Sequence, residues 1–555
     1  GAARQEKERM DTTAERRTGG QAVVAALKAH GVDTVFGIPG AHTLAIYDAL
    51  RDESGIRNVV VRQEGGAGYM ADGYARARGK PGVVLTVTGP GATNALTAVG
   101  GAYSDSSPLL VISSQIPREH LGKGQGFLHE MRDQRSAFAA VTDWTARVEH
   151  AEEIGPTINA AMAHFAQGRP TPAYIEIPLD ILDEEVDGPE SIAPMPTQPR
   201  PIADPEALGR AAAMLLAAER PVIYAGWGVI SADASEPLIR LAEHLGAPVA
   251  TSIKAKGAIP DQHPLCLGCA WAAEVRESPA LTEADMMLAI GTRFTLRTAA
   301  WGRVPIPPTL IQIDADETAL GRTVPVDLGL VGDAKDLLER LLALVTAGTQ
   351  AHRRDPRTLA GYREAIRARI DSAVAERSPL AHEVLLALRQ VMPANAIVTG
   401  DNCLFCFWAG RYLPIEQPRG WQFPMQFCTL GFALPAAIGA KMACPERPVV
   451  ALCGDGGFMF TCQELMTAVS LGLNLPVVVF NDAAYGSVRE NQTKRYGGRH
   501  TAVGLDTPDF PALARAYHAH GVRVERPSDL VGALTDAWAA DRPTLIELQA
   551  TFQFP

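Results

Sequence analysis

Short apolar runs alternate along the chain with longer segments of helical periodicity. The runs open segments 33–40, 58–66, 82–91 and 108–115, then 221–228, 248–257, 286–294 and 309–317, and finally 396–402, 449–458, 476–486 and 543–549. Most of them end in Gly or polar residues, at the point where a helix would begin. Strands separated by helical patterns are typical of parallel sheets with helices on both faces. We therefore predict an α/β fold with three doubly wound parallel-sheet domains.

Two breaks in composition separate these three groups of segments. The first break, at 184–204, is rich in Pro and acidic residues, and the second, at 346–374, contains a polar stretch with several Arg. At about 150 residues per domain, 555 residues accommodate three or four domains. The expected divisions are a flexible leader (1–17), a first domain (18–183), a linker (184–204), a central α/β domain (205–345), a second linker (346–374) and a last domain (375–555).

The composition is that of a folded globular protein and narrows the classes of function. Hydrophobic residues make up 47% of the chain and charged residues 20%, which excludes a disordered protein. The 62 acidic residues outnumber the 51 Lys and Arg, so broad neutralisation of nucleic-acid phosphates is not expected. No apolar run reaches the roughly 18 residues of a membrane span, and the charged N-terminus does not resemble a secretory signal. We expect no nucleic-acid or membrane partner and a cytoplasmic location.

The strongest chemical signal lies in the third group of segments. Asp455 follows one apolar strand, in VVALCGDGGF, and Asp482 follows the next, in PVVVFNDAAYG. Two carboxylates at neighbouring strand ends, with glycines that allow close backbone approach, suit a magnesium ion that bridges a diphosphate. Either aspartate alone could equally be a helix cap. The pair in this context favours the metal.

With this signature the chain resembles the thiamine diphosphate-dependent enzymes, specifically their acetolactate synthase-like branch. The resemblance covers nearly all of residues 18–550 and includes RQEGGAGYMADGYAR, TGPGATNALTAVGGAYSDSSPLLVISSQIP, KAKGAIPDQHPLCLG and TLGFALPAAIGA. It implies a pyrimidine-binding, a central and a diphosphate-binding domain, with thiamine diphosphate and Mg²⁺ as cofactors. It also implies a homodimer or homotetramer with active sites at subunit interfaces.

The resemblance gives three residues a role at the rings of the cofactor. Glu64 matches the glutamate that protonates the aminopyrimidine ring, which favours the imino form whose nitrogen deprotonates the thiazolium carbon; burial of the carboxyl would suit this task. The helix dipole also favours a glutamate in a first turn. Leu430 matches the bulky residue that bends the cofactor, although it could at the same time be ordinary core. The carbonyl of Cys428 would accept a hydrogen bond from the exocyclic amine.

The remaining implied contacts concern the cation and the diphosphate. Asp455 and Asp482 would bind the metal through their side chains and Ala484 through its carbonyl. Most relatives have Asn at position 482, so the extra charge should favour the cation and slightly repel the diphosphate. The implied cofactor contacts are Asp401, Asn402, Cys403, Gly454, Gly456, Gly457, Tyr485 and Gly486.

Three positions bear on proton transfer. Gly40-Ala41-His42 stands where acetolactate synthases have Gly-Gly-Ala and is similar to benzaldehyde lyase, so His42 is expected as a second catalytic group that titrates near the working pH. It could instead simply fill a helix start. His129 falls where relatives place a glutamine; it could bind a carboxylate, shuttle a proton, or be a surface loop residue. Gln115 matches a family position near the thiazolium, by resemblance only.

Two further departures bear on the substrate and on flavin. Ser487 and Asn491 stand where acetolactate synthases have Met and Trp, which predicts a wider, more polar pocket and a substrate larger than pyruvate. Residues 268–271 and 291–297 differ at several places from those of flavin-binding relatives. FAD is therefore a doubtful additional cofactor.

The resemblance and its departures favour a carboligase, which decarboxylates a 2-oxo acid and adds the resulting enamine to a carbonyl acceptor. The alternative is a simple 2-oxo acid decarboxylase that releases an aldehyde. A flavin-dependent oxidase on the same fold and a catalytically silent regulatory member are further alternatives. The intact Glu64 and Asp455 argue against the silent member.

Overall fold

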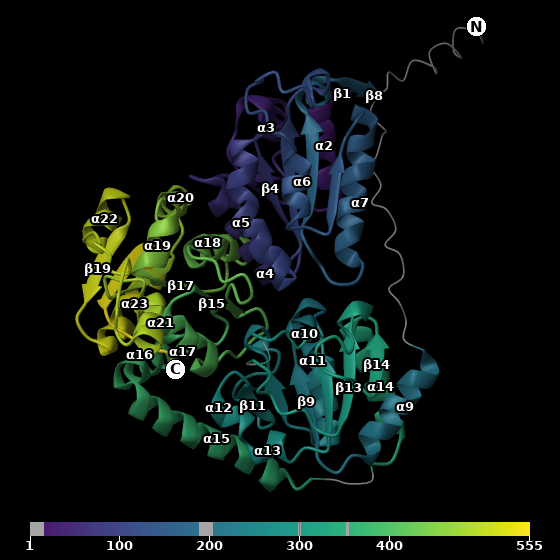
Figure 1. The fold of residues 1–555 in the computed structure, drawn as a ribbon, viewed down its shortest axis with the longest axis vertical. Coiled ribbons are helices and arrows are strands. Elements are labelled where there is room, and N and C mark those ends of the chain that lie inside the picture. The colour runs from purple at the N-terminus through teal and green to yellow at the C-terminus, as the bar shows by residue number, and fades with distance from the viewer. Residues whose placement is uncertain (1–15, 188–203, 298, 300, 351–353) are drawn as a thin grey trace. The chain divides into compact units, whose positions relative to one another are not determined.

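The computed structural model describes residues 16–187, 204–297, 299, 301–350 and 354–555, and it contains three six-stranded parallel sheets (Figure 1). The chain divides into two compact units, of which the first holds residues 1–75 and 80–198 and the second holds residues 76–79 and 199–555. One six-stranded sheet belongs to the first unit and two belong to the second. The predicted α/β class with three parallel sheets is confirmed.

The sheet of the first unit has the strand order β3-β2-β4-β5-β7-β6. Its strands are β2 (Thr34–Gly37), β3 (Arg57–Val60), β4 (Gly82–Thr86), β5 (Leu109–Gln115), β6 (Trp144–Arg147) and β7 (Ala173–Pro178). The principal helices are α2 (Gly19–Ala29), α3 (Leu44–Asp52), α4 (Glu64–Arg78), α5 (Pro90–Asp105), α6 (Gln134–Ala139) and α7 (Ile154–Ala166), with the short α8 (Leu179–Asp183). The winding reverses between β2 and β4, and open parallel sheets bind their ligands at such a switch point.

The central sheet has the order β11-β10-β9-β12-β13-β14, which is the order of dinucleotide-binding domains. Its strands are β9 (Pro221–Ala225), β10 (Val249–Thr251), β11 (Cys266–Cys269), β12 (Met286–Ile290), β13 (Thr309–Asp314) and β14 (Leu328–Val331). The associated helices are α9 (Pro205–Ala217), α10 (Trp227–Ser231), α11 (Ser235–Leu245), α12 (Ala273–Arg276), α13 (Pro279–Thr282) and α14 (Ala334–Ala347).

The third sheet repeats the winding of the first, with the order β16-β15-β17-β18-β20-β19. Its strands are β15 (Ile397–Gly400), β16 (Trp421–Gln422), β17 (Val449–Gly454), β18 (Pro476–Asn481), β19 (His520–Val524) and β20 (Thr544–Gln549). The helices are α16 (Pro379–Val391), α17 (Leu404–Tyr412), α18 (Ala433–Ala443), α19 (Asp455–Thr461), α20 (Glu464–Ser470), α21 (Gly486–Tyr496), α22 (Phe510–Ala516) and α23 (Leu530–Ala539). Its switch point lies between β15 and β17.

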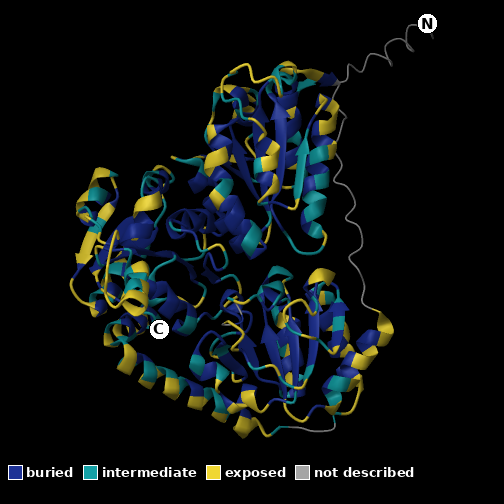
Figure 2. Ribbon diagram, viewed as in Figure 1, coloured by how far each residue is buried: buried dark blue, intermediate teal, exposed yellow. Residues whose placement is uncertain are grey.

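The cores are formed by strands that are apolar on both faces. Every residue of β5, β7, β17 and β18 is buried, and Figure 2 shows these central strands in dark blue between helices with exposed outer faces. Parallel strands need such cover on both faces, because the connecting helices pack on either side of the sheet. Their carboxyl ends emerge at one edge, where loops can carry functional side chains.

The segments between the domains differ in part from expectation. Residues 1–15 of the expected leader and 188–203 of the first expected linker lie outside the described residues. The described ends of these segments are not irregular: β1 (Arg16–Thr18) pairs antiparallel with β8 (Glu185–Asp187). Most of the second expected linker is helix α15 (Pro356–Arg377), which begins after the capping side chain of Asp355 and is rich in the helix formers Ala and Arg.

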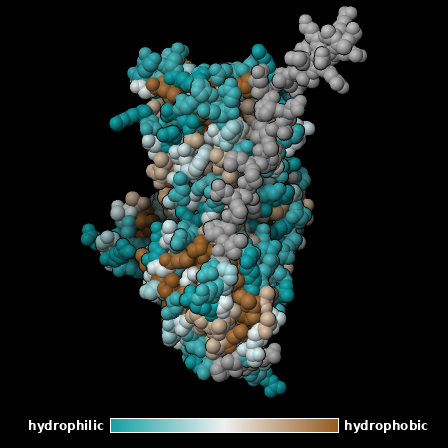
Figure 3. Space-filling model, turned by 90° about the vertical axis from the view of Figure 1, so that its right-hand side faces the viewer, coloured by the Kyte–Doolittle hydropathy of each residue, from teal (hydrophilic) through white to brown (hydrophobic). Residues whose placement is uncertain are grey.

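A helix that spans a membrane must be both long and apolar. Among the residues that the structure describes, no helix is both long enough and apolar enough to cross a bilayer. Hydrophilic side chains cover most of the face in Figure 3, with smaller hydrophobic patches between them.

Candidate active site

Three strand ends of the third sheet meet at one cavity. Residues 401–403 follow β15, Asp455 follows β17, and Asp482 follows β18. The cavity has a volume of about 280 Å³ and lies at the switch point of the sheet. Its walls include every residue of the third domain that the sequence assigned to cofactor or metal except Asp401: Asn402, Cys403, Cys428, Leu430, Gly454, Asp455, Gly456, Gly457, Asp482, Ala484, Tyr485 and Gly486.

The two predicted metal ligands are acids in a poorly hydrated place. Asp455 is 2% exposed, and its Oδ2 accepts a hydrogen bond of 3.1 Å from the backbone N–H of Ala484. Burial first, and then the neighbouring charge of Asp482, raise the pKa of Asp455 to about 6. A bound cation would relieve both effects, because it favours the ionised carboxylates. The pair therefore fits a divalent cation.

Arg489 compensates the additional charge at position 482. Its Nη2 lies 2.5 Å from Asp482 Oδ2, across the first turns of α21. Burial raises the pKa of Asp482, and the guanidinium of Arg489 opposes that rise. The charge that distinguishes Asp482 from the usual Asn is thus paired within the chain, so it should repel a diphosphate less than the sequence suggests.

Glycines keep this cavity open. A Cβ atom at Gly456 would lie 2.8 Å from the Tyr485 ring, and one at Gly486 would lie 2.8 Å from Asp482 Oδ2. Any larger residue at these two positions would therefore occupy the space beside Asp455 and Asp482. Among the described residues no group of three or more His, Cys, Asp and Glu side chains could hold a metal ion. A cation at Asp455 and Asp482 would complete its shell with backbone, water or ligand oxygens.

The loop beside these acids is organised by Asp401, which lies beneath the cavity rather than on its wall. Its fully buried carboxylate accepts hydrogen bonds from the backbone N–H groups of Asn402 and Gly431, at 2.8 and 3.1 Å. Burial raises the pKa of Asp401 to about 6. Asn402 Nδ2 donates to the carbonyl of Cys428 at 3.0 Å, and Cys428 has a φ of 58°. Leu430, two residues later, is only half-buried and lines the cavity.

Glu64 belongs to the first unit, where it is the first residue of α4. Its Oε2 accepts a hydrogen bond of 2.9 Å from Asn94 Nδ2, and a Cβ atom at Gly91 would lie 3.2 Å from its Oε1. The nearby hydroxyl of Tyr47 is buried and has no hydrogen-bond partner among the described residues. Burial raises the pKa of Tyr47, and the charge of Glu64 raises it further. Glu64 thus lies in a small polar site and is not simply a solvated helix start.

His42 and His129 come together at the switch point of the first sheet. His42 follows β2 and is 3% exposed; its Nδ1 lies 2.9 Å from Oγ1 of Thr88, which follows β4. The His42 and His129 ring centroids are 5.2 Å apart. Burial lowers the pKa of His42, and a charge on His129 would lower it further. His42 is therefore neutral at pH 7, and its pKa lies below the value near the working pH that the sequence suggested.

Hydrogen bonds around Thr88 favour one tautomer of His42. The Thr88 N–H donates to Ser114 Oγ at 2.9 Å, and the two hydroxyl oxygens also lie 2.9 Å apart. If Ser114 donates to Thr88, Thr88 can donate to His42 Nδ1 and every group is satisfied. The reverse direction leaves the Ser114 proton without an acceptor among the described residues. Buried donors are nearly always paired, so the arrangement favours a proton on His42 Nε2.

His129 has an unusual backbone conformation and packs closely against Gly89. It has a φ of 64°, and a Cβ atom at Gly89 would lie 2.4 Å from its carbonyl oxygen. Its Nδ1 is buried and has no hydrogen-bond partner among the described residues. The ring is half-buried beside His42, so His129 is not the freely exposed loop residue that was one alternative.

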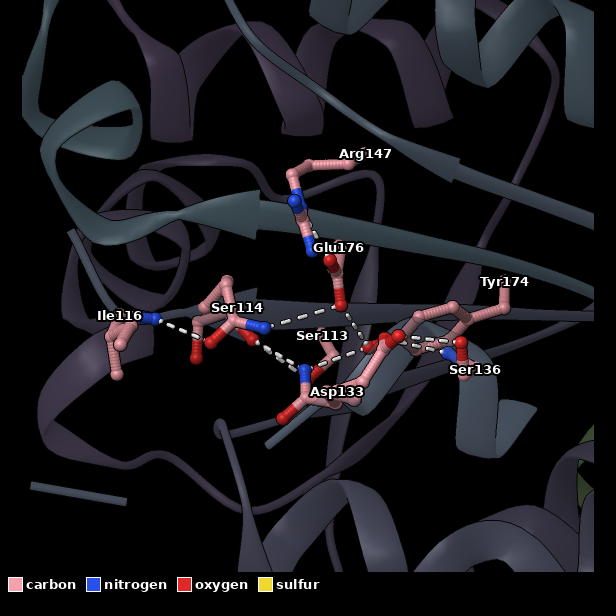
Figure 4. Close-up of polar contacts among 10 residues, drawn as sticks. Ser113, Ser114, Ile116, Asp133, Ser136, Arg147, Tyr174 and Glu176 are labelled. Atoms are coloured by element: carbon pink, nitrogen blue, oxygen red, sulfur yellow. Dashed lines mark hydrogen bonds and ion pairs between the residues drawn. The ribbon is translucent and has the colours of Figure 1, made fainter. Parts of the chain in front are cut away.

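Gln115 belongs to a buried polar network that the sequence did not reveal. Its Nε2 donates to Glu176 at 3.3 Å, and its Oε1 accepts from the Ile116 N–H at 2.8 Å. Arg147 also binds Glu176, at 2.5 Å, as Figure 4 shows. Gln134 extends this network to Tyr174, at 2.7 Å, and accepts from the backbone N–H of Gly89 at 2.7 Å. Gln115 is 3% exposed, and both ends of its amide are occupied. Single acids and amides in apolar strands carry no spacing signal that would have identified this network.

The glycines of the central sheet are explained by chain packing. The backbone N–H of Gly226 donates to Ile290 at 2.8 Å, and that of Gly228 donates to Gly291 at 3.0 Å. A Cβ atom at Gly226 would lie 2.2 Å from the Gly291 carbonyl oxygen. This contact alone requires glycine, so the glycines give no support to a flavin site.

Comparison with known proteins identifies the family. Residues 17–137 match the N-terminal TPP binding domain of thiamine pyrophosphate enzymes, residues 208–341 their central domain, and residues 401–548 their C-terminal TPP binding domain. These matches cover most of the chain, which belongs to the thiamine pyrophosphate enzyme family. The resemblance found in the sequence is confirmed.

The relatives of this chain include a probable decarboxylase and acetolactate synthases. A probable 2-ketoarginine decarboxylase of Pseudomonas aeruginosa is 41% identical over 550 residues, which cover 96% of this chain and 94% of that protein. A probable acetolactate synthase large subunit of Methanocaldococcus jannaschii is 34% identical over 96% of this chain and 91% of that protein. The large subunit of acetolactate synthase isozyme 3 of Escherichia coli is 35% identical over 94% and 92%.

Proposed function

We propose that this chain is a thiamine diphosphate- and Mg²⁺-dependent enzyme that decarboxylates a 2-oxo acid. The family and the names of its relatives support the cofactor and the substrate class. When bound, thiamine diphosphate supplies a nucleophilic carbon and an electron sink for the departing carboxylate's electrons. Asp455, Asp482 and the carbonyl of Ala484 would hold the cation, and the glycine-lined cavity would hold the diphosphate.

Glu64 and Leu430 would prepare the reactive end of the cofactor. The half-buried Glu64 would exchange a proton with the pyrimidine ring, and its hydrogen bond from Asn94 orients the carboxyl for that exchange. Leu430, on the cavity wall, would hold the rings in a bent form. From the family resemblance we propose a homodimer or homotetramer with active sites at subunit interfaces, and a cytoplasmic location.

The fate of the decarboxylated product is proposed to be protonation, with release of an aldehyde. The observation that carries this choice is the buried His42, joined to Thr88 and paired with His129. A proton that the pair takes up from solvent would pass from an imidazolium of the pair to the carbon that lost the carboxylate, which leaves both imidazoles neutral. The 41% identical relative, a probable decarboxylase, supports the same choice. This reverses the order in which the sequence alone ranked the two reactions.

Carboligation is the second candidate. The relatives named as acetolactate synthases support it, as does the likeness of Gly40-Ala41-His42 to benzaldehyde lyase. In this case the same histidines would move protons during carbon–carbon bond formation.

The substrate is proposed to be a 2-oxo acid with a long, polar side chain. Ser487 lines the cavity near the start of α21, and Asn491 lies one turn later, where its Nδ2 donates to the Ser487 carbonyl at 2.9 Å. Both side chains are smaller and more polar than the Met and Trp that acetolactate synthases have at these positions. The probable 2-ketoarginine decarboxylase makes a guanidinium-bearing 2-oxo acid the first compound to test.

The deciding experiment is incubation of the protein with thiamine diphosphate, Mg²⁺ and a panel of 2-oxo acids, with and without added aldehyde, analysed by mass spectrometry. Aldehyde with an unchanged carbon chain in every incubation supports the decarboxylase. Coupled products that appear with an acceptor support the carboligase instead. Absence of any turnover across pyruvate, 2-ketoarginine and aromatic 2-oxo acids would contradict the proposal.

A further inference from the structure

A larger cavity lies in the second unit, apart from the candidate active site. Its volume is about 550 Å³, and it shares no lining residue with the 280 Å³ cavity. It lies against β11, α15 and the end of α17, together with the loop that follows α17. Ligand cavities commonly fall between about 300 and 1,000 Å³. This one has the size for a small organic molecule.

Positive charge exceeds negative charge on its walls. The charged lining residues are Lys256, Arg363, Arg367, Arg389 and Arg411, against Asp261, Asp371 and Glu416. Two of the cations are paired, Arg367 with Asp261 at 3.6 Å and Arg389 with Asp371 at 3.2 Å. Lys256, Arg363 and Arg411 form no ion pair with any residue that the structure describes.

Lys256 is the most exceptional of the three. It is only 5% exposed, yet it makes no hydrogen bond or ion pair within the described parts of the chain. A lysine this deeply buried is rare unless it is paired, and its Nζ is not one of the buried polar atoms that lack a partner, so the stem is buried while the ammonium reaches the cavity. The cavity that Lys256 lines is where a compensating anion could bind.

Arg411 and Arg363 are fixed toward the same space. Arg411 lies 4.3 Å over the Trp271 ring, and its Nη1 donates to the Phe407 carbonyl at 2.9 Å. Arg363 donates to the Asp261 carbonyl at 3.3 Å, while its buried Nε has no partner among the described residues. Burial lowers the pKa of Arg411 to about 10 and also lowers that of Arg363. These guanidiniums are already ordered, so little further entropy is lost when they bind an anion.

We propose that this cavity binds a small organic phosphate at a site distinct from the active site. Phosphate oxygens match the forked donors of arginine and the point charge of lysine. Apolar side chains also line the cavity, which suits an organic group attached to the phosphate; they include Leu267, Ile366, Ile370, Met392 and Leu413. The inference does not depend on the proposed reaction.

The test uses the full chain saturated with thiamine diphosphate and Mg²⁺. Isothermal titration and thermal unfolding would measure binding of AMP, glucose 6-phosphate and inorganic phosphate, with adenosine and glucose as uncharged controls. We expect at least one phosphate compound to bind and to raise the unfolding temperature, while adenosine and glucose do not. Tighter binding of an organic ester than of inorganic phosphate identifies the organic group as part of the ligand, and equal binding overturns that part. No binding by any phosphate compound at millimolar concentration overturns the whole inference.

Variants locate the site. Lys256→Met should weaken binding at least tenfold and, because Met keeps the buried apolar stem and no ion pair is lost, should not lower the unfolding temperature in phosphate-free buffer. Arg369→Met is the matched control, because Arg369 lies on α15 but pairs with Glu277 at 2.8 Å and does not line the cavity. Equal binding by wild type and Lys256→Met overturns the site. If the variant does not fold, hydrogen exchange on the wild type decides: the ligand must protect residues 256–269 and 411–416, and protection elsewhere alone overturns it.

Discussion

His42 Nδ1 lies 2.9 Å from Thr88 Oγ1, which joins the ends of two strands at the point where the first sheet reverses its winding. Neither residue could be connected to the other from the sequence, because 46 positions separate them. The sequence left open whether His42 simply fills the start of a helix. The structure shows that it is buried and that this contact favours a proton on its Nε2. The proposed chemistry depends on that proton.

Thr88→Val should impair turnover without unfolding the protein. The variant keeps the shape of the side chain but removes the donor to His42 Nδ1, so the imidazole loses its preferred tautomer. We expect kcat to fall on the order of tenfold, a fraction of the contribution of a general acid, and the pH profile of kcat to shift. Thr86→Val is the matched control, since Thr86 is buried on β4 and its hydroxyl has no partner among the described residues. Equal kinetics in the two variants would mean that the hydrogen bond from Thr88 to His42 has no part in the mechanism.

Glu64→Gln should abolish turnover while leaving cofactor binding measurable. The amide cannot exchange a proton with the pyrimidine ring, and we expect a loss of roughly 100-fold or more in kcat. Glu206→Gln is the control, because Glu206 is an exposed glutamate in the first turn of α9 and shares only the helix-dipole role. Steady-state kinetics and a thiamine diphosphate titration would be measured for both. Normal kcat in Glu64→Gln would disprove the assigned role.

Asp455 and Asp482 should differ in importance. Asp455→Asn removes a buried charge that has no cationic partner among the described residues, and it should weaken Mg²⁺-dependent binding of thiamine diphosphate by about 100-fold or more, above the cost typical of residues outside the ligand shell. Asp482→Asn should cost about tenfold or less, because the charge that it removes is already paired with Arg489 and an amide oxygen can still bind the cation. Chelation of Mg²⁺ should lower cofactor affinity of the wild type. Binding that is indifferent to chelation and to Asp455→Asn would exclude the proposed cation site.

The ion pair between Arg147 and Glu176 should dominate the stability of the first unit's polar network. Glu176 is fully buried, and Arg147→Met leaves its charge without a cationic partner, which should cost about 3–5 kcal/mol of unfolding free energy. Arg240→Met breaks an exposed pair with Glu236 and should cost about 0.5 kcal/mol or less. Urea unfolding of both variants would measure the difference. Similar losses in the two would mean that burial of Glu176 carries no special cost.

The sequence predicted the central strands well because their apolar runs end in Gly and polar residues, as in β4, β5, β17 and β18. It did not name β6, β7, β11, β14, β16 or β19. All of these except β7 are edge strands, and they are at most five residues long. β7 is an inner strand, but Glu176 interrupts its apolar run. Helix α15 within the second expected linker was not predicted, because its three buried residues give too weak a pattern.

The sequence predicted those residues of the candidate site that belong to family motifs. Glycines and acids at strand ends have a recognisable spacing, and the residues implied for the third domain gather at one cavity apart from Asp401. Contacts made by single residues from distant strands have no such spacing. Arg489 beside Asp482, Thr88 beside His42, and the network of Gln115 were therefore visible only in the structure.

The lowered pKa of His42 should make stability depend on pH in a defined direction. Its ordinary pKa is about 6.5 in the unfolded chain, and burial followed by the charge of His129 lowers it in the folded protein. The unfolded state therefore binds more protons between these two values, so stability falls as the pH drops below about 6.5 and levels off below the folded-state pKa. Urea unfolding of wild type and His42→Phe at pH 7.5, 6.5 and 5.5 should show a steeper loss in the wild type. His500→Phe, at an exposed position, should follow the wild type. Parallel curves for wild type and His42→Phe would mean that His42 titrates alike in both states.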